Sequence, residues 1–229
     1  MSGNTYVIRR HESRGSSPVA EPVPAGQESG LRSRLTEAGL QAFARYGYEK
    51  TTVDDVIRLA GTSRATFYRY FENKRALFHE LSGDCFRALR ALADRLGALR
   101  PEEDARARLK LFLSDYDAVH VRFSGVIRAW TDNVAPHDPQ LAEEAGTAFV
   151  KLVNAFSGPI DAARMTSDVP TELRAALLYV VVERIHFYAH SQYSEVNIDR
   201  LHDTLSVMIQ RAFFGEAAPG GSRLRIGGR

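Results

Sequence analysis

The sequence is short of cysteine, of net charge and of long hydrophobic runs. Its 229 residues include one cysteine, Cys85, which excludes an intrachain disulfide framework or a cysteine-rich metal site and is typical of a reducing compartment. The longest apolar run covers eight positions, 175–182, whereas a membrane-spanning helix needs about 20. No apolar segment of the signal-peptide kind occurs at the N-terminus. We therefore expect a soluble, cytoplasmic protein with no membrane partner.

Strand signals are almost absent as well. No segment alternates apolar and polar residues over several positions, and no Asn-Gly or Asp-Gly pair joins two β-rich runs. The spacing that recurs is the i, i+3, i+4, i+7 pattern of amphipathic helices. Lys and Arg total 30 against 28 Asp and Glu, so a signal for nucleic-acid binding has to be local. The sequence predicts an all-α fold.

The chain divides into two predicted domains between two tails. Residues 1–30 are rich in Ser, Gly, Pro and Glu and are expected to be a disordered tail; the alternative is a DNA-contacting arm that carries Arg9, Arg10 and Arg14. A DNA-binding domain is expected over 31–78, a helical effector-binding and dimerisation domain over 79–215, and a flexible tail over 216–229. The expected helices cover 31–46, 53–60, 64–70, 73–96, 103–118, 122–134, 139–158, 170–191 and 198–214.

Two of these short helices form a predicted helix-turn-helix. Thr52 is a favourable N-cap for the first, Gly61 suits the tight turn, and Ser63 can cap the second. On the second helix Phe67 and Phe71 share an apolar face, which leaves a basic, hydrogen-bonding front. Residues 62–75 contain four basic residues and one acidic residue, a local charge of +3. Such a rod suits the major groove of DNA.

The DNA contacts are expected from this front and from the two helix starts. Side chains at the beginning of the second helix, Arg64 above all, are expected to read base edges, while Tyr70 and Lys74 are placed to contact phosphates. A plain αα-hairpin is the structural alternative. The predicted DNA-binding residues are Thr52, Ser63, Arg64, Ala65, Thr66, Tyr68, Arg69, Tyr70 and Lys74.

The stretch GYEKTTVDDVIRLAGTSRATFYRYFENKRALF closely resembles the DNA-binding domain of the TetR family of bacterial transcriptional regulators, and the match covers residues 31–81. Pairs such as Gly47-Tyr48 and Ala60-Gly61, and the run Thr66-Phe67-Tyr68, stand in register with the family pattern, although Ala65 occupies a position where glycine is common. The resemblance implies a homodimer on a palindromic double-stranded DNA operator, released when a small molecule binds the C-terminal domain.

Aromatic residues recur on one face of three successive predicted helices, as a binding tunnel would require, although they could equally fill an ordinary core. The resemblance implies a ligand cavity among these helices, and similarity to the subgroup that includes the ethionamide-resistance repressor implies a long apolar effector. The predicted ligand-binding residues are Phe112, Tyr116, Phe123, Ile127, Trp130, Phe149, Val153, Asn154, Phe156, Tyr179, Glu183 and His186, the polar ones serving to orient the ligand.

The last two predicted helices carry wide apolar stripes. Either each stripe serves its own core, or, as the resemblance implies, the two helices pair with their copies in a four-helix dimer interface. The predicted interface residues are Leu177, Val181, Leu201, Leu205, Met208, Ile209 and Phe213.

Two rival functions have weaker support in the sequence. Glu183, His186 and His190 share a helical face as metal ligands would, but a di-iron bundle requires a second E-x-x-H, which the sequence lacks. The G-x-S-x-G, phosphate-loop and C-x-x-C motifs are also absent, so we expect no enzyme, metal or cofactor. The remaining alternative to a ligand-responsive repressor is an architectural DNA-binding dimer with a filled interior and no effector.

Overall fold

The computed structural model describes residues 25–97, 105–132, 138–163, 168–190 and 195–214. Helices make up the secondary structure of these ranges, with no strand among them, which confirms the predicted all-α class. None of the helices in this part of the chain is both long and apolar enough to cross a membrane. The tail predictions for 1–24 and 215–229 fall outside the described residues.

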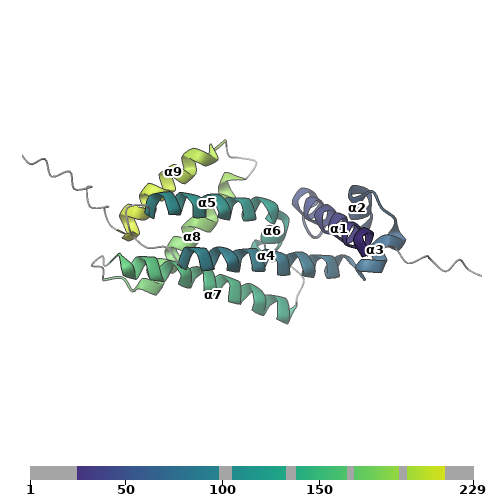
Figure 1. Ribbon diagram of the computed structural model, residues 1–229, viewed down its shortest axis with the longest axis horizontal. Coiled ribbons are helices and arrows are strands. Elements are labelled where there is room, and N and C mark those ends of the chain that lie inside the picture. The colour runs from purple at the N-terminus through teal and green to yellow at the C-terminus, as the bar shows by residue number, and fades with distance from the viewer. Residues whose placement is uncertain (1–24, 98–104, 133–137, 164–167, 191–194, 215–229) are drawn as a thin grey trace, which may run out of the picture.

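Three helices form the head at one end of the elongated molecule (Figure 1): α1 (Ala25–Tyr46), α2 (Val53–Ala60) and α3 (Arg64–Tyr70). Helix α1 begins six positions before the predicted start at 31, so the segment 25–30 of the expected tail is helical. Ala25, Gln27 and Glu28 are good helix formers, although Gly26 and Gly30 are poor ones, and helices lengthen at little cost once nucleated.

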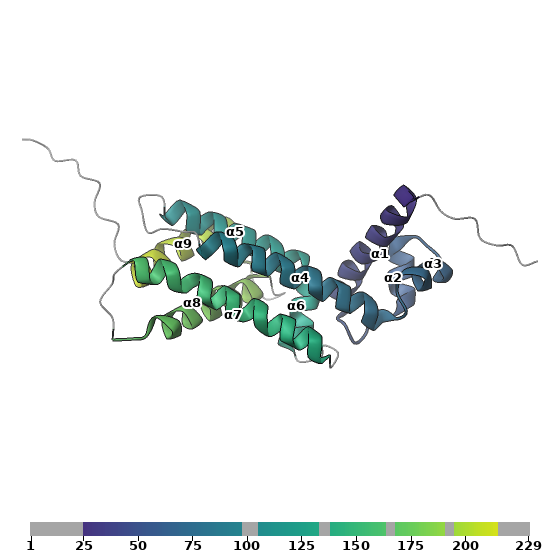
Figure 2. The ribbon, with the colours of Figure 1, turned by 60° about the horizontal axis from the view of Figure 1, so that its bottom comes forward.

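A long helix, α4 (Lys74–Gly97), runs from the head into the body without a break at the predicted domain boundary (Figure 1). It packs against α7 (Pro139–Ala162), and α7 packs against α8 (Thr171–Ala189). Figure 2 shows these helices along one side of the body. The remaining helices are α5 (Ala105–Arg122), α6 (Ser124–Thr131), α9 (Ile198–Ile209) and a π-helical turn, Gln210–Phe214.

Two clusters of buried side chains hold the fold together. One joins Phe43, Phe67 and Phe78 of the head and α4 to Val126 of α6. The other lies inside the body, where residues such as Phe156 pack between α4, α5, α8 and α9. Helix α6 is thus covalently part of the body but contributes to the core of the head.

The structure corrects some predicted helix ends. Pro159 was expected to end its helix, but α7 continues to Ala162. A proline removes one helical hydrogen bond, and here both Pro159 and Ile160 are buried, so tertiary packing holds the last turn in place. The predicted gap at 119–121 is also absent, because α5 continues to Arg122. The chain turns instead at Phe123, the N-cap residue of α6.

Candidate DNA-binding face and effector cavity

The local sequence explains the geometry of the helix-turn-helix. The Thr52 hydroxyl accepts from the Asp55 amide at 3.2 Å, and the Asp55 carboxylate accepts from the Thr52 amide at 3.0 Å, which completes a capping box. The Thr52 hydroxyl also donates to the Asp55 carboxylate at 2.6 Å, and this bond, followed by the one from the Thr52 amide, lowers the pKa of Asp55. Gly61 has a φ of 58°, a left-handed conformation that favours glycine, and Ser63 caps α3 by accepting from the Thr66 amide at 3.1 Å.

Helix α3 is apolar behind and polar in front. Phe67 is fully buried and its ring packs 5.8 Å from that of Phe71, whereas Ala65, Tyr68 and Arg69 are exposed. Thr52, Ser63 and Thr66 already serve as caps or cap partners in the free protein. The predicted front therefore exists, and its freely presented part is the exposed set on α3.

Arg64 is exposed but engaged. Its Nε donates to one Asp54 carboxylate oxygen at 2.9 Å and its Nη2 to the other at 2.5 Å. This bidentate pair raises the pKa of Arg64, mainly through the hydrogen bond to Asp54. A base or phosphate that binds Arg64 has to compete with a carboxylate of α2.

Two residues that are predicted to contact phosphates are engaged inside the head. The Lys74 ammonium donates to the carbonyl oxygens of Tyr48 and Glu49 at 2.8 and 3.1 Å and lies 4.5 Å from the Tyr48 ring centroid. Burial lowers its pKa. The Tyr70 hydroxyl is buried, and no hydrogen-bond partner for it occurs among the described residues. Lys74 turns into the head because two loop carbonyls after α1 accept its ammonium protons, whereas the Tyr70 side chain packs against the core of the head.

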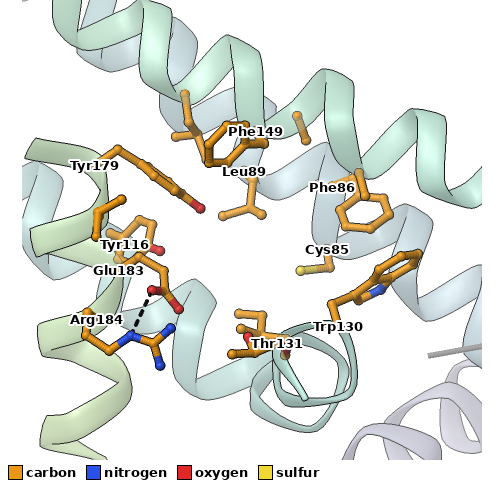
Figure 3. Close-up of a pocket in the computed structure, with 15 residues that line it drawn as sticks. Cys85, Phe86, Leu89, Tyr116, Trp130, Thr131, Phe149, Tyr179, Glu183 and Arg184 are labelled. Carbon is orange, nitrogen blue, oxygen red and sulfur yellow. Dashed lines mark hydrogen bonds and ion pairs between the residues drawn. The ribbon is translucent and has the colours of Figure 1, made fainter. Parts of the chain in front are cut away.

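The body contains a partly open cavity of about 400 Å³ lined by helices α4 to α8 (Figure 3). Its volume lies within the usual range of small-molecule sites. Its lining consists of Cys85, Phe86, Leu89, Tyr116, Ile127, Trp130, Thr131, Ala145, Ala148, Phe149, Leu152, Tyr179, Val180, Glu183 and Arg184.

Half of the predicted ligand-binding residues line this cavity, namely Tyr116, Ile127, Trp130, Phe149, Tyr179 and Glu183. The others lie elsewhere. Phe112 and Phe156 pack edge to face in the core of the body with centroids 5.6 Å apart, and the side chain of Asn154 is exposed. Phe123, Val153 and His186 likewise pack away from the lining.

The sequence analysis missed the wall contributed by α4, which includes Cys85, Phe86 and Leu89. The apolar spacing along α4 is visible in the sequence. It does not show which apolar residues border the cavity, because this helix of 24 residues contributes to the core of the head and to that of the body. Only the docking of α7 and α8 shows which residues border the cavity.

One end of the cavity is apolar and the other is polar. Phe86 and Trp130 meet at one end with ring centroids 5.7 Å apart, whereas the Tyr179 hydroxyl and the Glu183 carboxylate lie at the other (Figure 3). Burial raises the pKa of Glu183, although an ion pair with Arg184 at 3.5 Å counteracts this. Burial also raises the pKa of Tyr179 to about 12. The site thus suits an apolar body that ends in a polar group.

Helix α6 connects this cavity to the head. Its Ile127 and Trp130 border the cavity, while Arg128 donates to the carbonyl oxygens of Phe43 and Ala44 at the end of α1, at 3.1 and 2.9 Å. A charged donor at a helix C-terminus satisfies carbonyls that have no partner within the helix. The end of α1 is therefore fixed to a wall of the cavity.

The predicted dimer residues fall into two groups. Leu177 and Val181 on α8 and Met208 on α9 are about half exposed, as an unpartnered face would be. Leu205 and Ile209 are instead buried in the core of the body, which overturns their assignment to the interface. Leu201 and Phe213 are half-buried against the same core. Because α9 packs on α5, its apolar stripe covers the protein's own interior.

Comparison with known proteins agrees with the architecture. Residues 35–81 match the family described as "Bacterial regulatory proteins, tetR family". The chain is 25% identical over 156 residues to the HTH-type transcriptional repressor Rv1474c of Mycobacterium tuberculosis (strain ATCC 25618 / H37Rv), covering 66% of this chain and 78% of the relative. Alignments with two curated regulators of Bacillus subtilis (strain 168) span only 31% and 51% of their lengths.

Solved structures share the fold over about four fifths of the chain. The TetR family regulator PfmR from Thermus thermophilus has a TM-score of 0.61 and 16% identity, covering 78% of this chain and 97% of its own. FadR from Bacillus subtilis, solved in complex with stearoyl-CoA, has a TM-score of 0.58 and 13% identity, covering 81% and 99%. The family is one of DNA-binding regulators and not of enzymes, which agrees with the missing catalytic motifs. With its helix-turn-helix head, its helical body and this family match, the chain belongs to the TetR family of bacterial transcriptional regulators.

Proposed function

We propose that this regulator binds a palindromic operator in the cytoplasm as a homodimer and represses transcription until a small molecule enters the body. The observation that carries the proposal is the double role of α6, which borders the cavity on one side and holds the end of α1 on the other. A ligand shifts a conformational equilibrium only if it binds one state more tightly. Here the bound state would be the one in which α6 moves away from the cavity.

The effector class follows from the lining. Phe86, Leu89 and Trp130 offer an apolar surface, whereas Glu183 and Arg184 offer charges of both signs at the opposite end. An elongated apolar molecule with one polar end satisfies both regions. The fold neighbour FadR, which binds stearoyl-CoA, supports straight-chain fatty acids as the first probes.

The dimer proposal rests on α8. Leu173, Leu177, Val180 and Val181 follow helical spacing and are each about half exposed, which makes a continuous apolar stripe. A second copy of the same helix is the occupant that fits a palindromic operator, because two-fold symmetry in the protein matches two-fold symmetry in the DNA.

The effector proposal is tested with a cavity-filling variant. Ala145 borders the cavity, whereas Ala142, one turn earlier on α7, is exposed. Ala145→Phe should retain binding to the duplex upstream of the protein's own gene but lose its release by the effective fatty acid, and Ala142→Phe should behave as the wild type. Fluorescence anisotropy measures both properties. If no fatty acid of any length alters DNA binding or thermal stability, the effector class is wrong, and the architectural alternative gains support.

The dimer proposal has its own test. Leu177→Lys places a charge in the α8 stripe, while Leu111→Lys changes a somewhat more exposed leucine of α5 outside it. Light scattering after size exclusion should show a dimer for the wild type and Leu111→Lys, and a monomer for Leu177→Lys. A Leu177→Lys variant that remains dimeric would place the interface elsewhere.

A further inference from the structure

Outside the cavity, the body gathers histidines that the effector proposal does not use. His186 on α8 and His202 on α9 are 0% and 3% exposed, and their Nε2 atoms are 3.2 Å apart. The carboxylate of Asp117 on α5 joins them, with one ligand atom of each residue within 4.8 Å of the others. Helix α5, which is distant in sequence, and the consecutive helices α8 and α9 thus bring two imidazoles and a carboxylate together.

The hydrogen bonds orient these groups as metal ligands. His186 Nδ1 donates to the Val182 carbonyl at 2.6 Å, which leaves the Nε2 lone pair of the neutral ring directed at His202. His190 Nε2 lies 2.6 Å from the Asp117 carboxylate and holds it in place. A backbone carbonyl behind a histidine and a partner behind a carboxylate are the usual outer contacts of a metal site.

The distance between the two rings also fits. Two nitrogens that bind one tetrahedral Zn²⁺ at about 2.05 Å lie roughly 3.3 Å apart, close to the separation of the two Nε2 atoms. Without an ion the same contact is a single hydrogen bond, which requires His202 to carry its proton on Nε2. The 3.2 Å contact is therefore compatible with a shared metal ion or with a single hydrogen bond, and a metal titration distinguishes the two.

A neighbouring histidine is a second observation that indicates a missing ligand. His120 is 4% exposed, and neither of its ring nitrogens has a hydrogen-bond partner in the part of the chain that is described. Its ring stacks on His190 with centroids 5.9 Å apart. Buried polar groups in proteins are nearly always satisfied, so this unpartnered imidazole, which stacks on the histidine that contacts Asp117, indicates a further polar group next to the site.

We propose that Asp117, His186 and His202 bind a divalent transition-metal ion of the Zn²⁺ type. Imidazole and carboxylate ligands suit such ions, and three protein ligands leave a fourth position for water or a further ligand. The ion would join α5, α8 and α9. It would also fix the cavity wall, because the ring of Tyr116, which lines the cavity, packs 5.1 Å from that of His186. The sequence analysis expected no metal, since it considered only the ligands within α8.

The test is Zn²⁺ binding to the full chain, freed of metal with a chelator and of any affinity tag. Competition with a chromogenic chelator should give one tight site in the wild type. His202→Gln and Asp117→Asn should each weaken it at least tenfold, whereas His79→Gln, which changes a half-buried histidine of α4, should leave it intact. Zn²⁺ should raise the thermal midpoint of the wild type and of His79→Gln, but not that of His202→Gln or Asp117→Asn.

Co²⁺ keeps the proposal falsifiable if the variants fold poorly, as circular dichroism would reveal. The wild type should then show the visible d–d absorption of a tetrahedral ion without thiolate charge transfer, because the only cysteine lies in the cavity wall. Absence of this spectrum, or equal Zn²⁺ affinity in the wild type and in a folded His202→Gln variant, would overturn the metal site and leave the histidine pair as a structural hydrogen bond. Loss of the site would not affect the effector proposal, which rests on different residues.

Discussion

Gly125 at the start of α6 permits a close approach between α6 and the end of α1. A Cβ atom at this position would lie 2.3 Å from the carbonyl carbon of Phe43 and 2.4 Å from the amide nitrogen of Ala44. Both are backbone atoms that cannot rotate away, so Gly125→Ala forces α6 and α1 apart. Overpacking of this kind costs about 1–3 kcal/mol, and replacing a helical glycine by alanine otherwise gains roughly 0.5–1 kcal/mol.

Gly146 in α7 is the matched control. It is exposed within its helix, and an added Cβ would meet nothing within 4 Å. Gly146→Ala should therefore raise the thermal midpoint, whereas Gly125→Ala should lower it. For a chain of this size each kcal/mol corresponds to about 2–4 °C. Differential scanning calorimetry resolves shifts of opposite sign.

Operator binding tests the functional consequence. Helix α6 holds the end of α1, so the separation of these two helices in Gly125→Ala should weaken its binding to the operator. Gly146→Ala should bind the operator as the wild type does. Anisotropy titrations at one salt concentration measure the two affinities. If Gly125→Ala is as stabilising as Gly146→Ala and binds DNA normally, α6 does not abut α1, and the proposed route from cavity to DNA is wrong.

Three further predictions concern single side chains. Lys74→Ala should lower the free energy of unfolding by about 1.5–3 kcal/mol in denaturant titrations, since two carbonyls lose a charged donor. Exposed Lys50→Ala should change it by less than about 0.5 kcal/mol, and equal effects of the two substitutions would refute a stabilising role for the Lys74 hydrogen bonds. Asp54→Asn should release Arg64 and steepen the slope of log affinity for DNA against log salt concentration by up to about one unit. An unchanged slope in anisotropy titrations would show that the ion pair lies away from the DNA. Burial raises the pKa of Cys85 from 9.0 to about 12, so at pH 8 the native thiol should react with iodoacetamide about 1,000-fold more slowly than an ordinary one, with recovery on denaturation; a fast native reaction, followed by mass spectrometry, would contradict that burial.

The head could be predicted closely because its signals are local. Thr52, Gly61 and Ser63 each act within four residues of their own position, through caps and a left-handed turn. The buried back of α3 followed equally from the spacing of Phe67 and Phe71. Side chains that reach across the head were not predictable in this way, and Lys74 is the example, since its partners lie 25 and 26 positions earlier in the chain.

In the body, the sequence by itself determined that amphipathic helices exist and roughly where they begin and end. It could not determine which aromatic faces the cavity, because Phe112 and Phe149 have the same periodic setting yet one fills the core and the other borders the cavity. It also could not bring Asp117, His186 and His202 together. Helical periodicity specifies a face along one axis, whereas the neighbour of that face is decided by how the helices pack, and that depends on long-range contacts that only the tertiary structure contains.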